Sequence, residues 1–412
     1  MERLLERCCA LDVHKATVTA CVRVSGRGGG RRELIAEFST MTPDLPALRD
    51  WLVGSRVTHV AMEATGVYWK PVWYLLEDEF ELLLCNAAHV KQVPGRKTDV
   101  SDAQWLCQLL ECGLLRGSFV PPKPIRELRD LTRYRKALIR ERQREANRLQ
   151  KVLEDAGIKL GSVASNVLGV SGRAMIDALV RGEADPEALA QLARGRLRAK
   201  LPALREALEG RFSAHHALLC SHILAHLDYL EETIEALSAQ IEQRTLPFAH
   251  ELELLCTIPG IRRRGAEVIL AELGPDMSRF PSARHAASWA SFSPGNDQSA
   301  GKRRSGRTRK GDQWLRETLT ECALAATRTR NTYLKSQYLR LRRRRGEKKA
   351  IIAVAHSLLV IAYHVLKEQR PYHELGEDWF LRRDNPHALT RTLTRQLERL
   401  GHRVILEPLP TQ

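Results

Sequence analysis

The chain lacks the segments that mark an exported or membrane-spanning protein. Residues 1–7 contain no apolar segment of signal-peptide length, and no run approaches the roughly 18 apolar residues of a transmembrane helix. The nine cysteines are an odd number and form no C-x-x-C pair, which argues against a disulfide framework and against a zinc site. We therefore expect a cytoplasmic protein in a reducing compartment, with no membrane partner.

Acidic residues are also in deficit. The 412 residues include 65 Lys and Arg against 49 Asp and Glu, which gives a formal net charge of +16. Cationic side chains that neutralise phosphates release counterions and gain affinity, so this excess predicts a nucleic-acid partner. Hydrophobic residues make up 43% of the chain, enough for folded cores, and the length indicates two or three domains.

The N-terminal part is predicted to form a mixed α/β sheet domain. Apolar, β-branched runs predict strands, and amphipathic stretches predict the helices between them. The expected strands are residues 8–24, 33–39, 57–62 and 82–87, and the expected helices are residues 45–53, 68–77 and 101–115. The first two strands flank a Gly-rich turn and are expected to pair as a hairpin, after which strands and helices alternate.

The remainder is predicted to be mainly helical. Two long helices, 125–156 and 215–244, suggest an antiparallel coiled-coil arm or an oligomer seam, with an ordinary helical bundle as the alternative. A Pro-Gly turn between helices 252–260 and 266–273 resembles a helix-hairpin-helix, whose turn amides can hold a phosphate. The expected domains are residues 1–120, 121–250 and 251–370, followed by a peripheral tail at 371–412.

Four carboxylates occupy positions that suggest a metal site. Asp12 interrupts an apolar strand and Glu63 ends another, while Asp99 and Asp102 are spaced to share one face of a helix's first turn. Four carboxylates that converge would repel each other, so we expect two Mg²⁺ or Mn²⁺ ions among them, able to assist phosphoryl transfer. Each residue taken alone could instead be a helix cap or a loop carboxylate.

Two further residues lie beside this acidic set. Lys97 precedes the Asp99–Asp102 pair and could meet a strand phosphate, although a solvated surface lysine fits equally well. His14 follows Asp12 by two positions and could assist it, although an incidental position is the preferred interpretation.

The most distinctive segment is residues 293–316, SPGNDQSAGKRRSGRTRKGDQWLR. It combines small residues with cations ahead of a helix that Asp312 can cap, so the loop can approach and neutralise a phosphate. A serine there could also attack a phosphodiester, given a base or metal nearby. From the residues alone, phosphate binding is the preferred interpretation over nucleophilic attack.

Taken together, these motifs resemble the DEDD transposases of bacterial insertion sequences, a family of bridge-RNA-guided recombinases. The matching N-terminal segments are ALDVHK, AMEATGVYW and KTDVSDAQWLCQLLECGLL, and the C-terminal ones are LLCTIPGI and SFSPGNDQSAGKRRSGRTRKGDQWLRETLTECALAA. They occur in the family's order over most of residues 8–370. The resemblance implies a RuvC-like, RNase H-type N-terminal domain, a coiled-coil segment and a helical C-terminal transposase domain.

The resemblance also implies the roles of individual residues. Asp12, Glu63, Asp99 and Asp102 take the metal-ligand positions, and Ser299 takes that of the catalytic serine. The family serine is often followed by glycine. Ala300 follows Ser299 here, whereas Gly306 follows Ser305, so Ser305 is the rival nucleophile. Candidate contacts to nucleic-acid phosphates are Lys97, Lys302, Arg303, Arg307, Arg309 and Lys310.

The implied reaction is strand cleavage by serine attack on a DNA phosphate, followed by exchange and rejoining. The implied partners are the DNA of the element and its target, a structured guide RNA that pairs with both, and further copies of this chain in a dimer or tetramer. Two alternatives remain. A Holliday-junction resolvase-like nuclease would use the carboxylates and water without a serine adduct, and a non-catalytic nucleic-acid-binding protein would not cleave at all.

Overall fold

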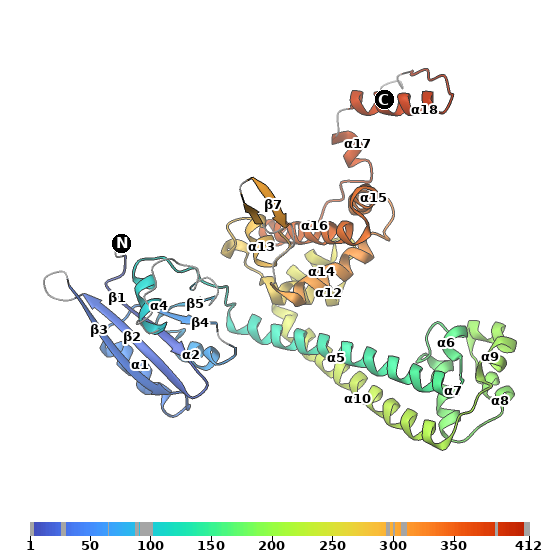
Figure 1. The fold of residues 1–412 in the computed structure, drawn as a ribbon, viewed down its shortest axis with the longest axis horizontal. Helices are drawn as coiled ribbons and strands as arrows, with labels where there is room; N and C mark the ends of the chain where they lie inside the picture. Colours follow the sequence, from blue (N-terminus) through green and yellow to red (C-terminus); the bar gives the residue numbers. More distant parts are fainter. Residues whose placement is uncertain are drawn as a thin grey trace. The chain divides into compact units, whose positions relative to one another are not determined.

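The computed structural model describes residues 4–25, 30–64, 66–86, 90, 102–293, 297–299, 301–305, 311–383 and 386–407. The chain divides into two compact units, Met1–Pro121 and Pro122–Gln412. Both appear in Figure 1, and each is described by itself.

The first unit is built on a five-stranded mixed sheet in the order β3-β2-β1-β4-β5. Its strands are β1 (Arg7–Val13), β2 (Thr17–Ser25), β3 (Arg31–Ser39), β4 (His59–Glu63) and β5 (Glu81–Cys85). The first three pair antiparallel, whereas β1 pairs with β4 and β4 with β5 in parallel. The prediction of a mixed α/β sheet is therefore confirmed.

One predicted strand is wrong. Residues 8–24 were expected to form a single strand, but they form β1 and β2, which pair with each other across a short turn closed by a 2.9 Å hydrogen bond from the His14 amide to the Thr17 carbonyl. The predicted hairpin is consequently β2 with β3. The turn contains neither glycine nor proline, and only the exposed polar pair His14-Lys15 marks it in an otherwise continuous β-forming run.

Helices cover both faces of this sheet, and the alternation of side chains divides its core in two. Leu11 and Met62 belong to the cluster shared with α1 (Leu45–Gly54) and α2 (Trp69–Leu76). Ala10 and Ala61, one position earlier on the same strands, pack in the cluster formed with α4 (Asp102–Glu111). Side chains at even positions of β1 and odd positions of β4 therefore face α4.

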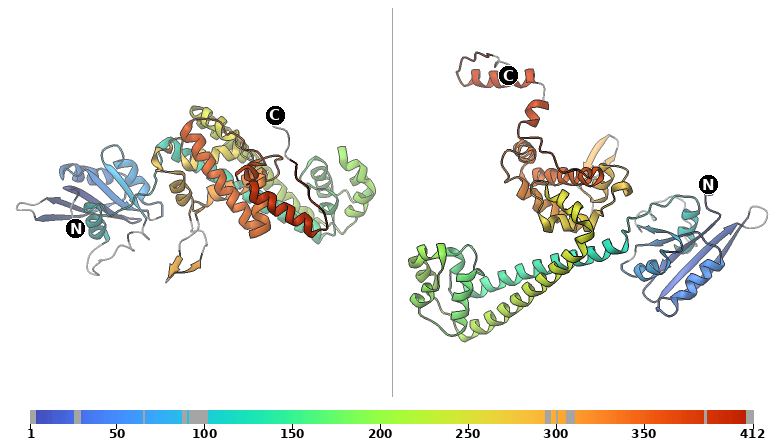
Figure 2. Two further views of the ribbon diagram at one scale, coloured as in Figure 1. Left: turned by 90° about the horizontal axis from the view of Figure 1, so that it is seen from above. Right: turned by 180° about the vertical axis from the view of Figure 1, so that it is seen from behind.

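The second unit begins with two long helices that pack side by side, α5 (Lys123–Asp155) and α10 (Ala214–Thr245) (Figures 1 and 2). Ion pairs Arg142–Glu231 and Arg244–Glu127 join them in antiparallel order. Both helices were predicted, and their pairing agrees with the antiparallel arm. Four short helices pack together at the far end: α6 (Leu160–Val163), α7 (Val170–Val180), α8 (Pro186–Gln191) and α9 (Leu201–Leu208).

A helical bundle follows. Its helices are α11 (Ala249–Cys256), α12 (Arg263–Leu273), α13 (Ala283–Trp289), α14 (Gln313–Ala326), α15 (Tyr333–Arg345) and α16 (Glu347–Glu368), with α17 (Trp379–Arg383) and α18 (Pro386–Arg399) in the tail. Between α13 and α14, residues expected to be a loop include a two-stranded hairpin of β6 (Asp297–Ser299) and β7 (Lys302–Ser305). Gly301 has a φ of 74°, which permits the reversal between the strands.

Helix α16 is a long apolar helix of 22 residues. By length and composition it could cross a membrane, although no segment of that kind was predicted. In the structure 56% of its apolar window is buried, and it packs against α13, α14 and α15.

Candidate active site

Two of the predicted metal ligands lie at the ends of adjacent parallel strands. The register pairs Leu11 of β1 with Met62 of β4, so Asp12 and Glu63 are the next residues on each strand. Since Ala10 and Ala61 face α4, alternation directs Asp12 and Glu63 to the same side. Both side chains are half-buried at the carboxyl ends of these strands.

Helix α4 brings a third carboxylate to the same end of the sheet. The Cys107 thiol lies 3.8 Å from that of Cys8, and the Leu4 amide donates to the Glu111 carbonyl over 2.9 Å. The helix therefore runs opposite to β1, and its first turn points toward the carboxyl ends of β1 and β4. Asp102, its first residue, is exposed there.

The structure thus places Asp12, Glu63 and Asp102 toward one end of one sheet face. Asp99 and Lys97 lie outside the described residues. Within the described part of the chain, no group of three or more His, Cys, Asp or Glu side chains is close enough to hold a metal ion. The donor chemistry nevertheless fits a hard divalent cation, because carboxylate oxygens are the ligands that Mg²⁺ and Mn²⁺ prefer.

Two further side chains, those of His14 and Cys85, lie beside these carboxylates. His14 was interpreted as incidental, yet its Nε2 lies 3.1 Å from the Asp12 carboxylate, an exposed contact made by the tight turn after β1. Cys85 lies on β5, where its backbone is paired in register with that of Glu63 on β4. Burial and the nearby charge of Glu63 raise the pKa of the Cys85 thiol to about 12, so that the thiol is protonated at neutral pH.

The other end of α4 is fixed by a buried ion cluster. Glu111, 2% exposed, forms ion pairs with Arg23, at 2.9 Å, and with Arg31. Arg31 additionally donates to the carbonyls of Glu6 and Leu5. These contacts tie the helix to the β2–β3 hairpin and hence hold its first turn, with Asp102, over the sheet. Nothing in the sequence spacing pairs Glu111 with residues 80 or more positions earlier.

The candidate serine lies in the hairpin of the second unit. The backbone of Ser299 pairs with that of Lys302 at the end of β6, beside the turn at Gly301. The Lys302 side chain is exposed. The backbones of Arg303 and Ser305 are part of β7, whereas Arg307, Arg309 and Lys310 lie outside the described residues.

The base of this segment is tightly packed. A Cβ added to Gly311 would lie 1.9 Å from the Ser291 hydroxyl oxygen, so only glycine fits where the two stems meet. Ser291 is itself buried, with a φ of 58°, and its carbonyl accepts from Arg316 over 3.2 Å. Asp312 caps α14 by accepting from the Leu315 amide at 3.0 Å, which confirms the predicted cap.

A buried cluster of charged side chains contacts Asp312, at the start of α14 and next to these stems. Glu272, with its side chain fully buried, accepts two 2.7 Å hydrogen bonds from Arg133 and lies 3.1 Å from Arg129, both on α5. Arg133 also approaches the Asp312 carboxylate at 3.7 Å. Burial raises the pKa of Glu272 to about 7 despite the hydrogen bonds from Arg133. The cluster thereby connects the long helix, α12 and the start of α14.

Comparison with known proteins agrees with these two regions. The IS110-type DEDD transposase model matches residues 9–158, and the transposase model of the IS116/IS110/IS902 family matches residues 252–339. A Sinorhizobium fredii protein described as a transposase (y4pF/y4sB) is 27% identical over 84% of this chain and 78% of its own length. Pilin gene-inverting proteins of Moraxella bovis and Moraxella lacunata are 31% and 30% identical over 36% of this chain and 47% of theirs.

The first matched region includes all four candidate metal ligands, and the second includes Ser299 with the basic residues after it. A DEDD-type domain indicates dependence on a divalent metal. The chain belongs to the IS110-type DEDD transposases, enzymes that cut and rejoin DNA during transposition.

Proposed function

We propose that this transposase breaks and rejoins DNA through a covalent serine link made by Ser299, with metal-binding carboxylates at Asp12, Glu63, Asp99 and Asp102. The observation that carries the proposal is the placement of three of these carboxylates toward the same end of one sheet face, on two parallel strand ends and at a helix start. Bound there, Mg²⁺ or Mn²⁺, as two ions, would neutralise the phosphate and stabilise the leaving oxygen.

The proposed exchange conserves phosphoester bonds. The Ser299 hydroxyl oxygen forms a bond to the scissile phosphorus and gives up its proton to solvent. The bond from phosphorus to one deoxyribose oxygen breaks, and that oxygen takes up a proton. A hydroxyl from a second DNA end then attacks the phosphoserine and releases the serine. Because each bond broken is replaced by one of the same kind, no high-energy cofactor is required.

The cations near Ser299 would bind the strand during the exchange. Lys302, exposed and paired in backbone register with Ser299, is the member of this group whose side chain the structure describes. The others proposed for phosphate contact are Lys97, Arg303, Arg307, Arg309 and Lys310. Arginine suits this role because its planar guanidinium can donate two hydrogen bonds to one phosphate.

Sequence choice is proposed to come from a bridge RNA that pairs with donor and target DNA, while the protein binds backbone and shape. The assembly is proposed to be a cytoplasmic homo-oligomer, a dimer or tetramer. The division into a RuvC-like nuclease domain (1–120), a coiled-coil segment (121–250), a transposase domain with a helix-hairpin-helix-like turn (251–370) and a tail (371–412) also stays a prediction.

The test uses the full chain with Mg²⁺, its flanking noncoding RNA and DNA carrying the element junction. A protein–DNA adduct is sought on a denaturing gel for the parent protein, Ser299→Ala and Ser305→Ala. Glu63→Gln is compared with Glu37→Gln, an exposed glutamate on β3 of the same sheet. We expect the adduct to disappear in Ser299→Ala and Glu63→Gln, and to persist in the other two variants.

Other outcomes separate the alternatives. Loss of the adduct in Ser305→Ala alone would move the nucleophile to that residue. Cleavage without an adduct, unaffected by Ser299→Ala but lost in Glu63→Gln, would overturn the serine mechanism in favour of a resolvase-like nuclease. Cleavage that is unchanged when the RNA is omitted would remove the guide from the proposal.

A further inference from the structure

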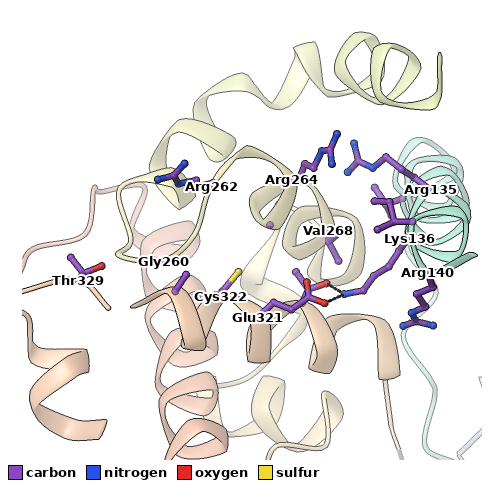
Figure 3. A pocket seen from close by; sticks show the side chains of 15 residues that line it. Arg135, Lys136, Arg140, Gly260, Arg262, Arg264, Val268, Glu321, Cys322 and Thr329 are labelled. Carbon is purple, nitrogen blue, oxygen red and sulfur yellow. Dashed lines mark hydrogen bonds and ion pairs between the residues drawn. The ribbon is translucent and has the colours of Figure 1, made fainter. Parts of the chain in front are cut away.

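The second unit contains a cleft of about 520 Å³ whose walls come from α5, the turn between α11 and α12, α12 itself, and α14 (Figure 3). Six of its lining residues are apolar or small and are together called its floor: Ile139, Gly260, Gly265, Val268, Cys322 and Ala325. Gly260 makes the close packing possible. Its φ is 87°, and a Cβ there would lie 2.4 Å from the Cys322 carbonyl oxygen of α14.

Cations outnumber anions around this floor. Arg135, Lys136, Arg140, Arg262 and Arg264 line the cleft, whereas Glu321 is its one lining carboxylate among the described residues. Lys136 lies 3.4 Å from Glu321 and donates to Thr318 over 2.8 Å. Arg140 pairs with Glu317. These contacts pair the α5 cations Lys136 and Arg140 with carboxylates of α14. The excess of positive charge therefore lies on the opposite side of the cleft, at the α11–α12 turn and the start of α12.

The excess is concentrated on Arg262 and Arg264. Within the described residues their side chains make no hydrogen bond or ion pair. Arg264 extends toward the buried Arg135 (Figure 3). The Glu267 carboxylate that pairs with Arg135 at 2.7 Å is shared with Arg263 at 3.1 Å. The Glu267 carboxylate therefore neutralises two guanidinium groups, those of Arg135 and Arg263. The approach of a third guanidinium, that of Arg264, is unfavourable unless an anion binds among them.

We propose that this cleft binds one unstacked nucleotide of a single-stranded nucleic acid, with its base or sugar on the apolar floor and its flanking phosphates on Arg262 and Arg264. The volume lies within the roughly 300–1,000 Å³ typical of small-ligand sites and suits one nucleotide. A duplex keeps the faces of its bases stacked inside and can reach only the charged rim. The cleft therefore favours a single strand or an extruded base.

Arg140 indicates the path that a bound nucleic-acid strand would take beyond the cleft. Its guanidinium lies 4.7 Å from the centroid of the Trp314 ring, in the first turn of α14 and directly after the basic segment that carries Ser299. Thr318 of the cleft is one helical turn from Trp314, about 6 Å along the axis. A strand seated in the cleft could thus continue past Arg140 and Trp314 toward that segment.

The test measures binding of fluorescent single strands of about ten nucleotides, as DNA and as RNA, and of the matching duplex, to the full chain in EDTA, where metal-dependent cleavage cannot contribute. Arg262→Gln/Arg264→Gln is compared with Arg196→Gln/Arg198→Gln, which removes two exposed arginines from residues 195–200 of the same unit. Ala325→Leu fills the floor from an exposed position without changing charge.

We expect Arg262→Gln/Arg264→Gln to weaken single-strand binding about tenfold and to make the slope of log K against log salt shallower by about 1.4, as two lost phosphate contacts predict. Ala325→Leu should weaken binding severalfold with an unchanged salt slope. The DNA and RNA arms identify which strand the cleft prefers. Equal losses in Arg196→Gln/Arg198→Gln, or a loss confined to the duplex, would overturn the proposal. Because the assay needs neither metal nor Ser299, its outcome is independent of the serine mechanism.

Discussion

The two candidate catalytic segments are held in place by different means. In the sheet unit the carboxylates sit on regular elements, and α4 is fixed at Glu111, about 14 Å along the helix from Asp102. In the second unit Ser299 lies in a hairpin that has two strands and no further sheet partner among the described residues. A rigid helix can transmit position over that length, whereas a short hairpin has to be fixed at its own base.

Both regions nevertheless use the same device away from the reacting groups, a buried glutamate bound by two arginines. Glu111 pairs with Arg23 and Arg31, and Glu272 pairs with Arg129 and Arg133. Removal of one member of such a cluster leaves uncompensated buried charge, which is more costly than loss of an exposed pair. The comparison can be tested by disturbing each anchor separately.

The largest effect is expected for Glu111→Gln. It leaves Arg23 and Arg31 without their shared carboxylate and should lower the free energy of unfolding by about 3 kcal/mol. Asp102→Asn, at the exposed end of the same helix, should change it by less than about 0.5 kcal/mol while abolishing cleavage. Urea titration and the adduct assay measure the two quantities. Equal destabilisation by the two variants would contradict the division of α4 into a structural end and a functional end.

A pH-dependent effect is expected for Glu272. Its pKa is about 7 in the folded state, above the ordinary value of 4.5, so between these pH values the folded protein holds a proton that the unfolded chain has released. The free energy of unfolding should therefore fall as pH rises from about 4.5 to about 7, by up to about 3 kcal/mol.

Urea titration across this range should show that slope flattened in Glu272→Gln. Glu253→Gln, a change at an exposed glutamate on the neighbouring α11, should retain it. A slope that persists unchanged in Glu272→Gln would assign it to other groups.

The smallest effect is expected at the base of the hairpin. Gly311→Ala drives a methyl group into Ser291 and should lower the free energy of unfolding by about 2 kcal/mol and reduce adduct formation. Adding Ser291→Gly removes the clashing hydroxymethyl group and suits the φ of 58° at that position. The double variant should recover both properties. A failure to recover in the adduct assay would show that the stems do not position the serine through this contact.

Much of the chemistry could be predicted without coordinates. The alternation of apolar residues predicted a mixed sheet, and the two long helices were predicted within two residues of their ends, because periodic burial is a local property of the sequence. The motifs around Asp12, Glu63 and Ser299 predicted the family, which the comparisons confirm. The turn at residues 14–16 was missed because it carries no glycine or proline.

The sequence by itself determined which residue types are available: the carboxylates, the serine and the cations, each in a recognisable local motif. Only the tertiary structure decided how the surrounding charges are matched. The partners of Glu111 and Glu272, and the two arginines of the cleft whose side chains have no partner among the described residues, depend on contacts between segments far apart in the chain. Such contacts leave no periodic trace in the sequence, because burial and pairing of a charge depend on which surfaces the completed fold brings together.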